Sequence, residues 1–301
     1  MKIPFRPKIL YAIPIVFLFF ATTAYLTHVA IIRRFQSLAD SILRVSSTNT
    51  KKAVIFALTT ENNLPTRGKA VGETWGQQAK DYQEEGIEGS PIDVVFATSH
   101  DTTPYGLSRI PIEDVGYGDI YKKTYASFYY LYKYHLNDYK WFMKADDDTF
   151  VKIHKLMSHI NSPLVKPRVP LFVGRPMDFG CWGGPGYLLN REALSIVGPY
   201  LFYCEKNFPG FEDVEFGNCV EYAFKKERPN LHFPGCTDFP DGNGHEFLPL
   251  TYEDKEWNNI ANASYTMKIT FSESTGWSFG KAVAIHTVRG EMMYKLNAIY
   301  S

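Results

Sequence analysis

The chain has 301 residues, and its 45% hydrophobic and 21% charged residues exclude a disordered, collagenous or coiled-coil protein. Lys and Arg together number 32, as do Asp and Glu, so the formal net charge is zero. Because no overall basic field is available to neutralise phosphates, we expect no nucleic-acid partner.

The amino-terminal segment predicts a membrane anchor. Residues 9–32 are apolar apart from His28, and a run of about 20 such residues spans a bilayer as a helix. A cleaved signal peptide is the alternative, but the run is long and ends at Arg33 and Arg34 without a clear cleavage site. The prediction is a type II protein with four segments: a cytoplasmic tail at 1–8, a transmembrane signal-anchor at 9–32, a stem at 33–52 and a lumenal domain at 53–301.

The four cysteines all lie in the predicted lumenal domain, where oxidation is expected. They allow three disulfide pairings. We favour Cys204 with Cys219, which closes a short loop and leaves Cys181 with Cys236. The tripeptide beginning at Asn262 is a sequon for N-glycosylation, as expected of a secretory protein.

Hydrophobic patterning predicts an α/β domain. Short apolar runs predict strands at 54–59, 92–98, 141–145, 171–174, 186–189 and 282–288. Helical spacing predicts helices at 66–75, 121–136 and 212–226, and the aromatic residues of 121–136 are expected in the core. Alternating strands and helices indicate a mainly parallel sheet, in which ligands bind beyond the carboxyl ends of the strands.

Three consecutive acids, Asp146, Asp147 and Asp148, directly follow the strand predicted at 141–145. Adjacent carboxylates repel unless a cation lies between them, and oxygen ligands suit Mg²⁺, Mn²⁺ or Ca²⁺. An EF-hand is excluded, because Val151 stands where its loop needs glycine and Met157 where it needs glutamate. A solvated acidic turn remains the alternative to a metal site.

Three further features have both a structural and a functional interpretation. Glu212 and Asp213 either complement a helix N-terminus or supply a general base. His286, within an apolar run, is either a packed histidine or a metal ligand. The glycine-rich stretch 180–186 either forms a turn or permits close approach of a ligand. Phosphate-loop, nucleophile-elbow and zincin motifs are absent from the sequence.

In this order, the segments resemble the β1,3-glycosyltransferase family of the core 1 β1,3-galactosyltransferases and the Fringe enzymes. The matching pieces are GKAVGETWG (68–76), WFMKADDDTFV (141–151), FVGRP (172–176), GGPGYLLNREAL (183–194), FEDVEFGNCV (211–220) and AVAIHTVRGEMMYKLNAIY (282–300). The last piece is more similar to the core 1 enzymes than to Fringe. Their additional cysteines before the histidine strand are absent here.

The resemblance implies a GT-A glycosyltransferase fold with a mainly parallel central sheet, preceded by one transmembrane helix in the Golgi membrane. It implies Mn²⁺ and UDP-galactose as donor, with a glycoprotein or glycopeptide as acceptor. It assigns the metal to Asp146, Asp148 and His286, and catalysis to Asp213 as general base. The donor contacts are assigned to Asp146 and Asp147, and we add Trp75, Arg175 and Trp182 as expected pocket residues.

The expected reaction is inverting transfer of galactose to the 3-hydroxyl of GalNAc-α-Ser/Thr. Two alternatives stay open: a related β1,3-glycosyltransferase with another donor or acceptor, and a non-catalytic relative similar to a synthase-specific chaperone. A lumenal lectin-like protein that binds glycans is a third alternative. The sequence leaves open whether the chain forms a homodimer.

Overall fold

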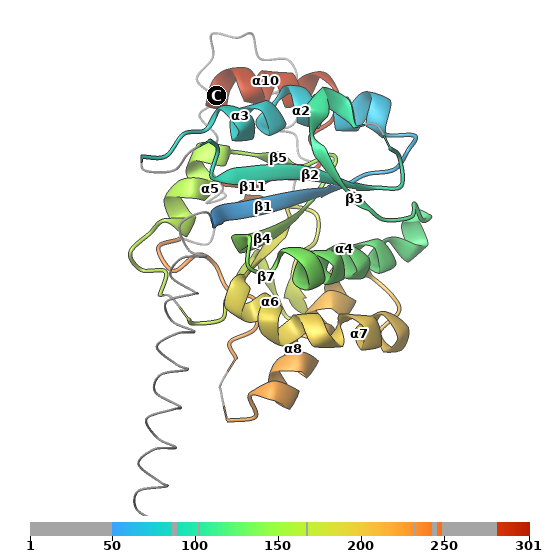
Figure 1. Ribbon diagram of the computed structural model, residues 1–301, viewed down its shortest axis with the longest axis vertical. Helices are drawn as coiled ribbons and strands as arrows, with labels where there is room; N and C mark the ends of the chain where they lie inside the picture. Colours follow the sequence, from blue (N-terminus) through green and yellow to red (C-terminus); the bar gives the residue numbers. More distant parts are fainter. Residues whose placement is uncertain are drawn as a thin grey trace, which may run out of the picture. The chain divides into compact units, whose positions relative to one another are not determined.

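The structure is a computed structural model that describes residues 50–85, 89–101, 103–166, 168–230, 233–242, 246–248 and 282–301 (Figure 1). The predicted anchor at 9–32, the tail and the Asn262 sequon lie outside these residues. Among the residues described, no helix has the length and apolar character needed to cross a bilayer. The segment Lys51–Ser301 forms one compact unit.

A six-stranded sheet forms the centre of this unit (Figure 1). In spatial order its strands are β3 (Ser108–Pro111), β2 (Ile92–Thr98), β1 (Lys51–Leu58), β4 (Tyr139–Asp146), β9 (Tyr187–Asn190) and β6 (Phe172–Gly174). Only β9 runs antiparallel to its neighbours in this sheet. The prediction of an α/β domain with a mainly parallel central sheet is therefore confirmed.

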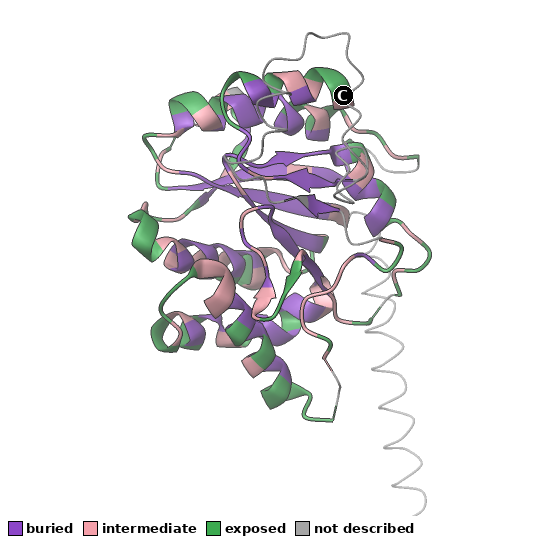
Figure 2. Cartoon of the chain, turned by 180° about the vertical axis from the view of Figure 1, so that it is seen from behind, coloured by how far each residue is buried: buried purple, intermediate pink, exposed green. Residues whose placement is uncertain are grey.

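Helices cover both faces of the sheet, which explains why its central strands are apolar on both sides (Figures 1 and 2). One layer contains α2 (Lys69–Glu73), α3 (Trp75–Asp81), α5 (Ile153–Ile160) and α10 (Glu291–Tyr300). The other contains α4 (Ile120–His135), α6 (Arg191–Val197), α7 (Leu201–Asn207) and α8 (Glu212–Glu227). Short helical turns lie at η3 (Leu64–Gly68), η4 (Pro104–Gly106), η5 (Tyr117–Asp119) and η6 (Gly198–Tyr200).

The aromatic side chains of α4 pack in the core, as predicted. The Phe128 ring lies 4.8 Å from the rings of both Phe56 and Phe216. Tyr187 stacks on Phe216 at 5.1 Å. This aromatic cluster fixes α4 and α8 against the same face of the sheet.

Two sequence predictions need correction. The helix predicted at 66–75 is divided into η3, α2 and α3, because the backbone at Thr74 is not helical, with φ −113° and ψ −106°. The strand predicted at 282–288 is only β11 (Ala284–Ile285), because the chain turns at Thr287, where φ is +63°. Helices α5, α6, α7 and α10 and strand β3 of the central sheet were not predicted.

A second, smaller sheet joins distant parts of the chain. Strand β11 lies between β10 (Phe247–Leu248) and β5 (Phe150–Val151). Its antiparallel pairing with β5 places Ile285 opposite Phe150. The segment after β11 is thereby brought to the acidic turn that precedes β5. A two-stranded hairpin, β7 (Pro176–Met177) and β8 (Gly180–Cys181), leads into the glycine-rich loop.

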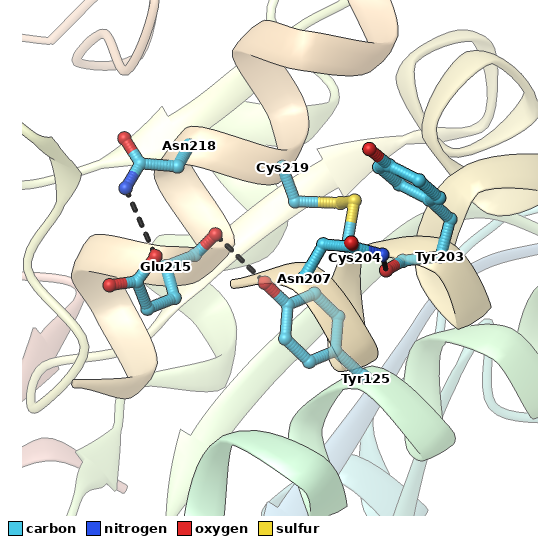
Figure 3. The surroundings of a disulfide bond; sticks show 7 residues. All are labelled: Tyr125, Tyr203, Cys204, Asn207, Glu215, Asn218 and Cys219. Carbon is cyan, nitrogen blue, oxygen red and sulfur yellow. Dashed lines mark hydrogen bonds between the residues drawn. A yellow bond between two sulfur atoms is a disulfide. The ribbon is translucent and has the colours of Figure 1, made fainter. Parts of the chain in front are cut away.

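The favoured disulfide pairing is confirmed. Cys204 of α7 is bonded to Cys219 of α8, and Cys181 to Cys236. Figure 3 shows the first bond beside Tyr125, whose hydroxyl donates a 2.8 Å hydrogen bond to the backbone oxygen of Glu215. These links attach the first turns of α8 to both α7 and α4.

Candidate functional site

The acidic turn lies at the carboxyl end of β4, where a parallel sheet is expected to bind ligands. Asp146 is the last residue of β4. His286 follows β11, and the backbone N–H of Val288 donates a 2.7 Å hydrogen bond to the backbone oxygen of Asp148. The β5–β11 pairing and this bond together hold His286 against the acids.

Asp146, Asp148 and His286 form the group in the described residues that could hold a metal ion, with one ligand atom of each within 4.8 Å of the others. Nε2 of His286 lies 3.3 Å from Oδ1 of Asp148 and 3.8 Å from Oδ2 of Asp146. Among the described side chains, Oδ1 of Asp146 is buried and accepts no hydrogen bond, although Nζ of Lys144 lies 2.9 Å away. Two carboxylates and one imidazole fit a divalent cation such as Mn²⁺.

The orientation of His286 depends on its neighbours. Nδ1 lies 3.1 Å from Oγ1 of Thr287, so this nitrogen can donate to the hydroxyl while Nε2 faces the acids. Gly184 packs against the same ring, and a Cβ atom there would lie 2.5 Å from Nδ1. The absence of a side chain at Gly184 therefore leaves room for the His286 ring, while the predicted close approach of a ligand to this loop stays a prediction.

The two acids of the cluster differ in their electrostatic surroundings. Burial raises the pKa of Asp146 above its ordinary value, and Lys144 and His286 limit that rise. Burial also acts against ionised Asp148, but His286 and Arg289 outweigh it and lower the pKa of Asp148 to about 2. Asp148 is therefore ionised at neutral pH, and a bound cation would favour ionised Asp146 as well.

Lys144 connects the cluster to the start of α8. Its side chain is 2% exposed, and Nζ lies 2.9 Å from Asp146 and 3.3 Å from Oε2 of Glu212. It also donates a 3.0 Å hydrogen bond to the backbone oxygen of Gly183. Burial disfavours its charge, yet the two acids outweigh burial and raise the pKa of Lys144. The hydroxyl of Tyr187 donates to the other oxygen of Glu212.

Asp213 lies beside this network in the first turn of α8. Its Oδ2 accepts a 3.0 Å hydrogen bond from the backbone N–H of Gly183. Because Gly184 contacts His286, consecutive loop residues contact the predicted base and the predicted metal ligand. The structure thus brings Asp213 and the metal cluster to the same loop. Glu212 instead pairs with the buried side chains of Lys144 and Tyr187.

Asp147 points to a different set of partners. Its carboxylate accepts hydrogen bonds from Thr59 at 2.8 Å and from Asn63 at 3.0 Å, and Arg67 lies 3.2 Å away. These residues follow β1. Asp147 therefore joins the acidic turn to the β1 edge, and it lies outside the metal-ligand group.

The other predicted donor contacts lie in different places. Trp75 is fully buried in the core layer of α2, α3 and α10. Arg175 and Trp182 are adjacent on the β7–β8 hairpin, where the Trp182 N–H donates a 2.9 Å hydrogen bond to the backbone oxygen of Arg175. Both are partly exposed. Arg175 precedes the glycine-rich stretch and Trp182 lies within it, whereas Trp75 has no exposed surface.

Sequence reasoning missed Lys144, Arg67 and Arg289. Lys144 had a recognisable signal, because residues two apart on a strand share a face and Lys144 therefore lies on the same face as Asp146. A lysine in the middle of a buried apolar strand needs an acidic partner. Arg67 and Arg289 had no such local signal, since their partners are distant in the sequence.

The chain is similar in sequence to known glycosyltransferases and chondroitin sulfate synthases. It is 34% identical over 177 residues to glycoprotein-N-acetylgalactosamine 3-beta-galactosyltransferase 1 of Xenopus laevis, covering 56% of this chain and 45% of that protein. It is 28% identical over 190 residues to mouse chondroitin sulfate synthase 3, covering 55% of this chain and 20% of that protein. It is 26% identical over 217 residues to mouse chondroitin sulfate synthase 2, covering 67% of this chain and 24% of that protein.

These relatives confirm the resemblance to β1,3-glycosyltransferases that the motifs indicate. The chain spans less than half the length of each of them. No protein-family profile matches the chain.

Two solved structures are similar at lower levels. One is a glycosyltransferase involved in glycosylation of the major capsid of PBCV-1, with a TM-score of 0.36, 14% identity and coverage of 62% of this chain and 82% of that one. The other is mouse xyloside xylosyltransferase 1 in its apo form, with a TM-score of 0.40, 11% identity and coverage of 79% and 97%.

Proposed function

We propose that the chain is a metal-dependent, inverting β1,3-glycosyltransferase of GT-A fold that moves galactose from UDP-galactose to the 3-hydroxyl of GalNAc-α-Ser/Thr. The observation that carries the proposal is the convergence of Asp146, Asp148 and His286 beside Gly184, with Asp213 hydrogen-bonded to the neighbouring Gly183. The similarity to a galactosyltransferase supports the choice of donor.

The charges of the site fit a divalent ion. Five carboxylates, those of Asp146, Asp147, Asp148, Glu212 and Asp213, gather around three basic side chains, those of Lys144, Arg67 and Arg289. One divalent cation would balance the remaining two negative charges. Asp146, Asp148 and His286 would hold it, and when bound it supplies positive charge to the donor diphosphate and to the UDP that departs.

The chain's own chemistry is acid–base. Asp213 accepts the proton of the acceptor hydroxyl while the oxygen of that hydroxyl forms a bond to the anomeric carbon of the sugar. The bond from that carbon to the UDP oxygen breaks, and UDP leaves with its electron pair. The Gly183 N–H fixes one oxygen of Asp213, which keeps the carboxylate oriented for this transfer.

A second candidate follows from the other relatives. The chain is also similar to chondroitin sulfate synthases and, with 28% identity over 173 residues, to human chondroitin sulfate glucuronyltransferase. These names favour a glucuronyl donor and a chondroitin acceptor. The same metal cluster and base would serve either donor.

We further propose that the protein is a type II Golgi membrane protein, anchored by residues 9–32 with the catalytic domain in the lumen. The two disulfides support an oxidising compartment.

A donor and acceptor panel tests the proposal. The full chain with Mn²⁺ is incubated with UDP-galactose or UDP-glucuronic acid, and with a GalNAc-α-Ser/Thr peptide or a chondroitin oligosaccharide. We expect EDTA-sensitive transfer of galactose to the peptide. Glucuronyl transfer to the oligosaccharide would support the second candidate. Binding to a galactosyltransferase without any transfer would support the chaperone-like alternative, and glycan binding without metal or transfer the lectin-like one.

A further inference from the structure

Two arginines that the mechanism does not use converge on Asp148. Nε and Nη2 of Arg289 lie 2.8 Å and 2.7 Å from Oδ2 of Asp148. Nη1 of Arg67 lies 3.6 Å from the same oxygen and 3.2 Å from Asp147. Arg67 belongs to η3 after β1, whereas Arg289 lies two residues before α10. The fold therefore brings two guanidinium groups from distant segments to one carboxylate.

Asp148 divides its two oxygens between these partners. Oδ1 faces Nε2 of His286 at 3.3 Å, on the side of the metal cluster, and Oδ2 faces the guanidinium groups. A cation held through Oδ1 would therefore leave both arginines in place. Positive charge would then lie on both sides of the same acid.

Both arginines keep contact with solvent. The side chain of Arg67 is 32% exposed and that of Arg289 is 44% exposed, whereas Asp148 is 6% exposed. Arginine presents five N–H donors in a planar fork that matches phosphate oxygens. Because both guanidinium groups keep contact with solvent, an incoming phosphate can reach them.

We propose that Arg67 and Arg289 form a phosphate-binding pair that holds the diphosphate of the nucleotide-sugar donor beside the metal ion. This inference rests on the proposed function and assigns two residues to its donor site. We assign a diphosphate as the ligand because Asp148 would have positive charge on two sides. A cation would lie at Oδ1, and the two guanidinium groups lie at Oδ2. A diphosphate can contact both sides at once, with one phosphate at each.

The test is nucleotide binding to the full chain, measured by titration calorimetry at saturating Mn²⁺ with UDP, UMP and uridine. Arg289→Gln and Arg67→Gln should each weaken UDP binding by about 10- to 100-fold, the range of a lost charge-assisted hydrogen bond. Uridine binding should not change, and UMP should lose less affinity than UDP. Arg289→Lys should recover part of the loss, because it keeps the charge without the fork. Arg109→Gln is the matched control, because Arg109 lies on β3 and pairs with Asp101.

A second readout separates phosphate binding from a merely structural role. Mn²⁺ affinity without nucleotide should not fall in Arg289→Gln, because Oδ1 of Asp148 and His286 remain. If Mn²⁺ and UDP affinity fell together, the arginine would only hold Asp148, and the inference would be wrong. It would also be wrong if UDP-glucuronic acid binding weakened while UDP binding did not, because the ligand would then be a sugar carboxylate.

The remaining outcomes distinguish this inference from the proposed function. If the unaltered chain with Mn²⁺ did not bind UDP, the proposed function would fail and this inference with it. If the unaltered chain bound UDP and both glutamine variants bound it equally well, only the assignment of the arginines would fail. Melting temperatures of each variant establish that it is folded.

Discussion

Nζ of Lys144 lies 3.3 Å from Oε2 of Glu212, and this contact links the strand that ends at the predicted metal ligand Asp146 to the helix that carries the predicted base. Lys144 is on β4 two residues before Asp146, and Glu212 directly precedes Asp213 on α8. A single buried cation thus connects the two halves of the proposed active site. Its removal should affect both.

We expect Lys144→Met to lower the free energy of unfolding of the metal-free chain by about 3–5 kcal/mol, because Asp146 and Glu212 would lose the cation between them. Urea unfolding measures this loss. Mn²⁺ should restore part of it, since the ion returns positive charge to Asp146. Lys140→Met is the control, because Lys140 lies on the same strand but is exposed and should change stability by no more than about 0.5 kcal/mol. Equal stability of the two variants would contradict the role of Lys144.

Asp213→Asn should reduce the turnover number by roughly 10²- to 10⁴-fold, the usual contribution of a general base. Binding of UDP with Mn²⁺ should remain, because Asp213 is outside the metal-ligand group. Steady-state kinetics with the active donor and acceptor pair gives the first quantity, and calorimetry gives the second. Glu215→Gln removes a charge from the same helical turn and should retain turnover. A fully active Asp213→Asn enzyme would exclude this residue as the base.

Mn²⁺ should stabilise the unaltered chain and not the Asp148→Asn variant. At about 100 times its dissociation constant, a ligand that binds only the folded state adds about 2.7 kcal/mol to the free energy of unfolding. Thermal unfolding with and without Mn²⁺ measures the difference, and EDTA should abolish it. Asp241→Asn is the control, because that acid pairs with His159 away from the site and the variant should still respond to Mn²⁺. The metal assignment fails if Asp148→Asn responds equally.

The central sheet and the metal cluster could be predicted from the sequence for different reasons. Apolar runs identified β1, β2 and β4, because these strands are buried on both faces. The acids at 146–148 stood out through their position after β4. His286 was ambiguous by pattern, and only the family resemblance assigned it to the metal, which stays a prediction. The β5–β11 pairing brings His286 to the acids, and no local sequence pattern predicts that pairing.

Other features depended on contacts between distant segments. Strand β3 has one buried residue, Ile110, so it lacks the apolar run that identifies a strand. The strand predicted at 282–288 ends early because His286 and Thr287 turn toward the acids. The partners of Asp147 come from the segment after β1, and their types alone do not indicate which acid they bind. These contacts depend on which strands pair in the fold, and a local sequence pattern does not show that.

Replacing both Cys204 and Cys219 by alanine should lower the free energy of unfolding by about 3 kcal/mol, the chain-entropy value for a loop of this size. The sequence separation of the two cysteines is 15, and the Cys181–Cys236 bond remains in the variant. Urea unfolding under non-reducing conditions measures the effect. Mn²⁺ affinity should be retained, because α8 carries no metal ligand. Unchanged stability would show that α7 and α8 need no covalent link.

Gly184→Ala should weaken Mn²⁺ binding, because the added Cβ would lie 2.5 Å from Nδ1 of His286 and 2.7 Å from its Cε1. The ring would have to move, and its Nε2 would leave the position that faces Asp148. Residues that orient a metal ligand typically contribute about 10- to 100-fold to metal affinity, and we expect a loss in that range. Calorimetric titration with Mn²⁺ measures it. Gly118→Ala is the matched control, since a Cβ atom there meets no described atom within 4 Å. If both variants bound Mn²⁺ like the unaltered chain, His286 could not be a ligand held in place by this loop.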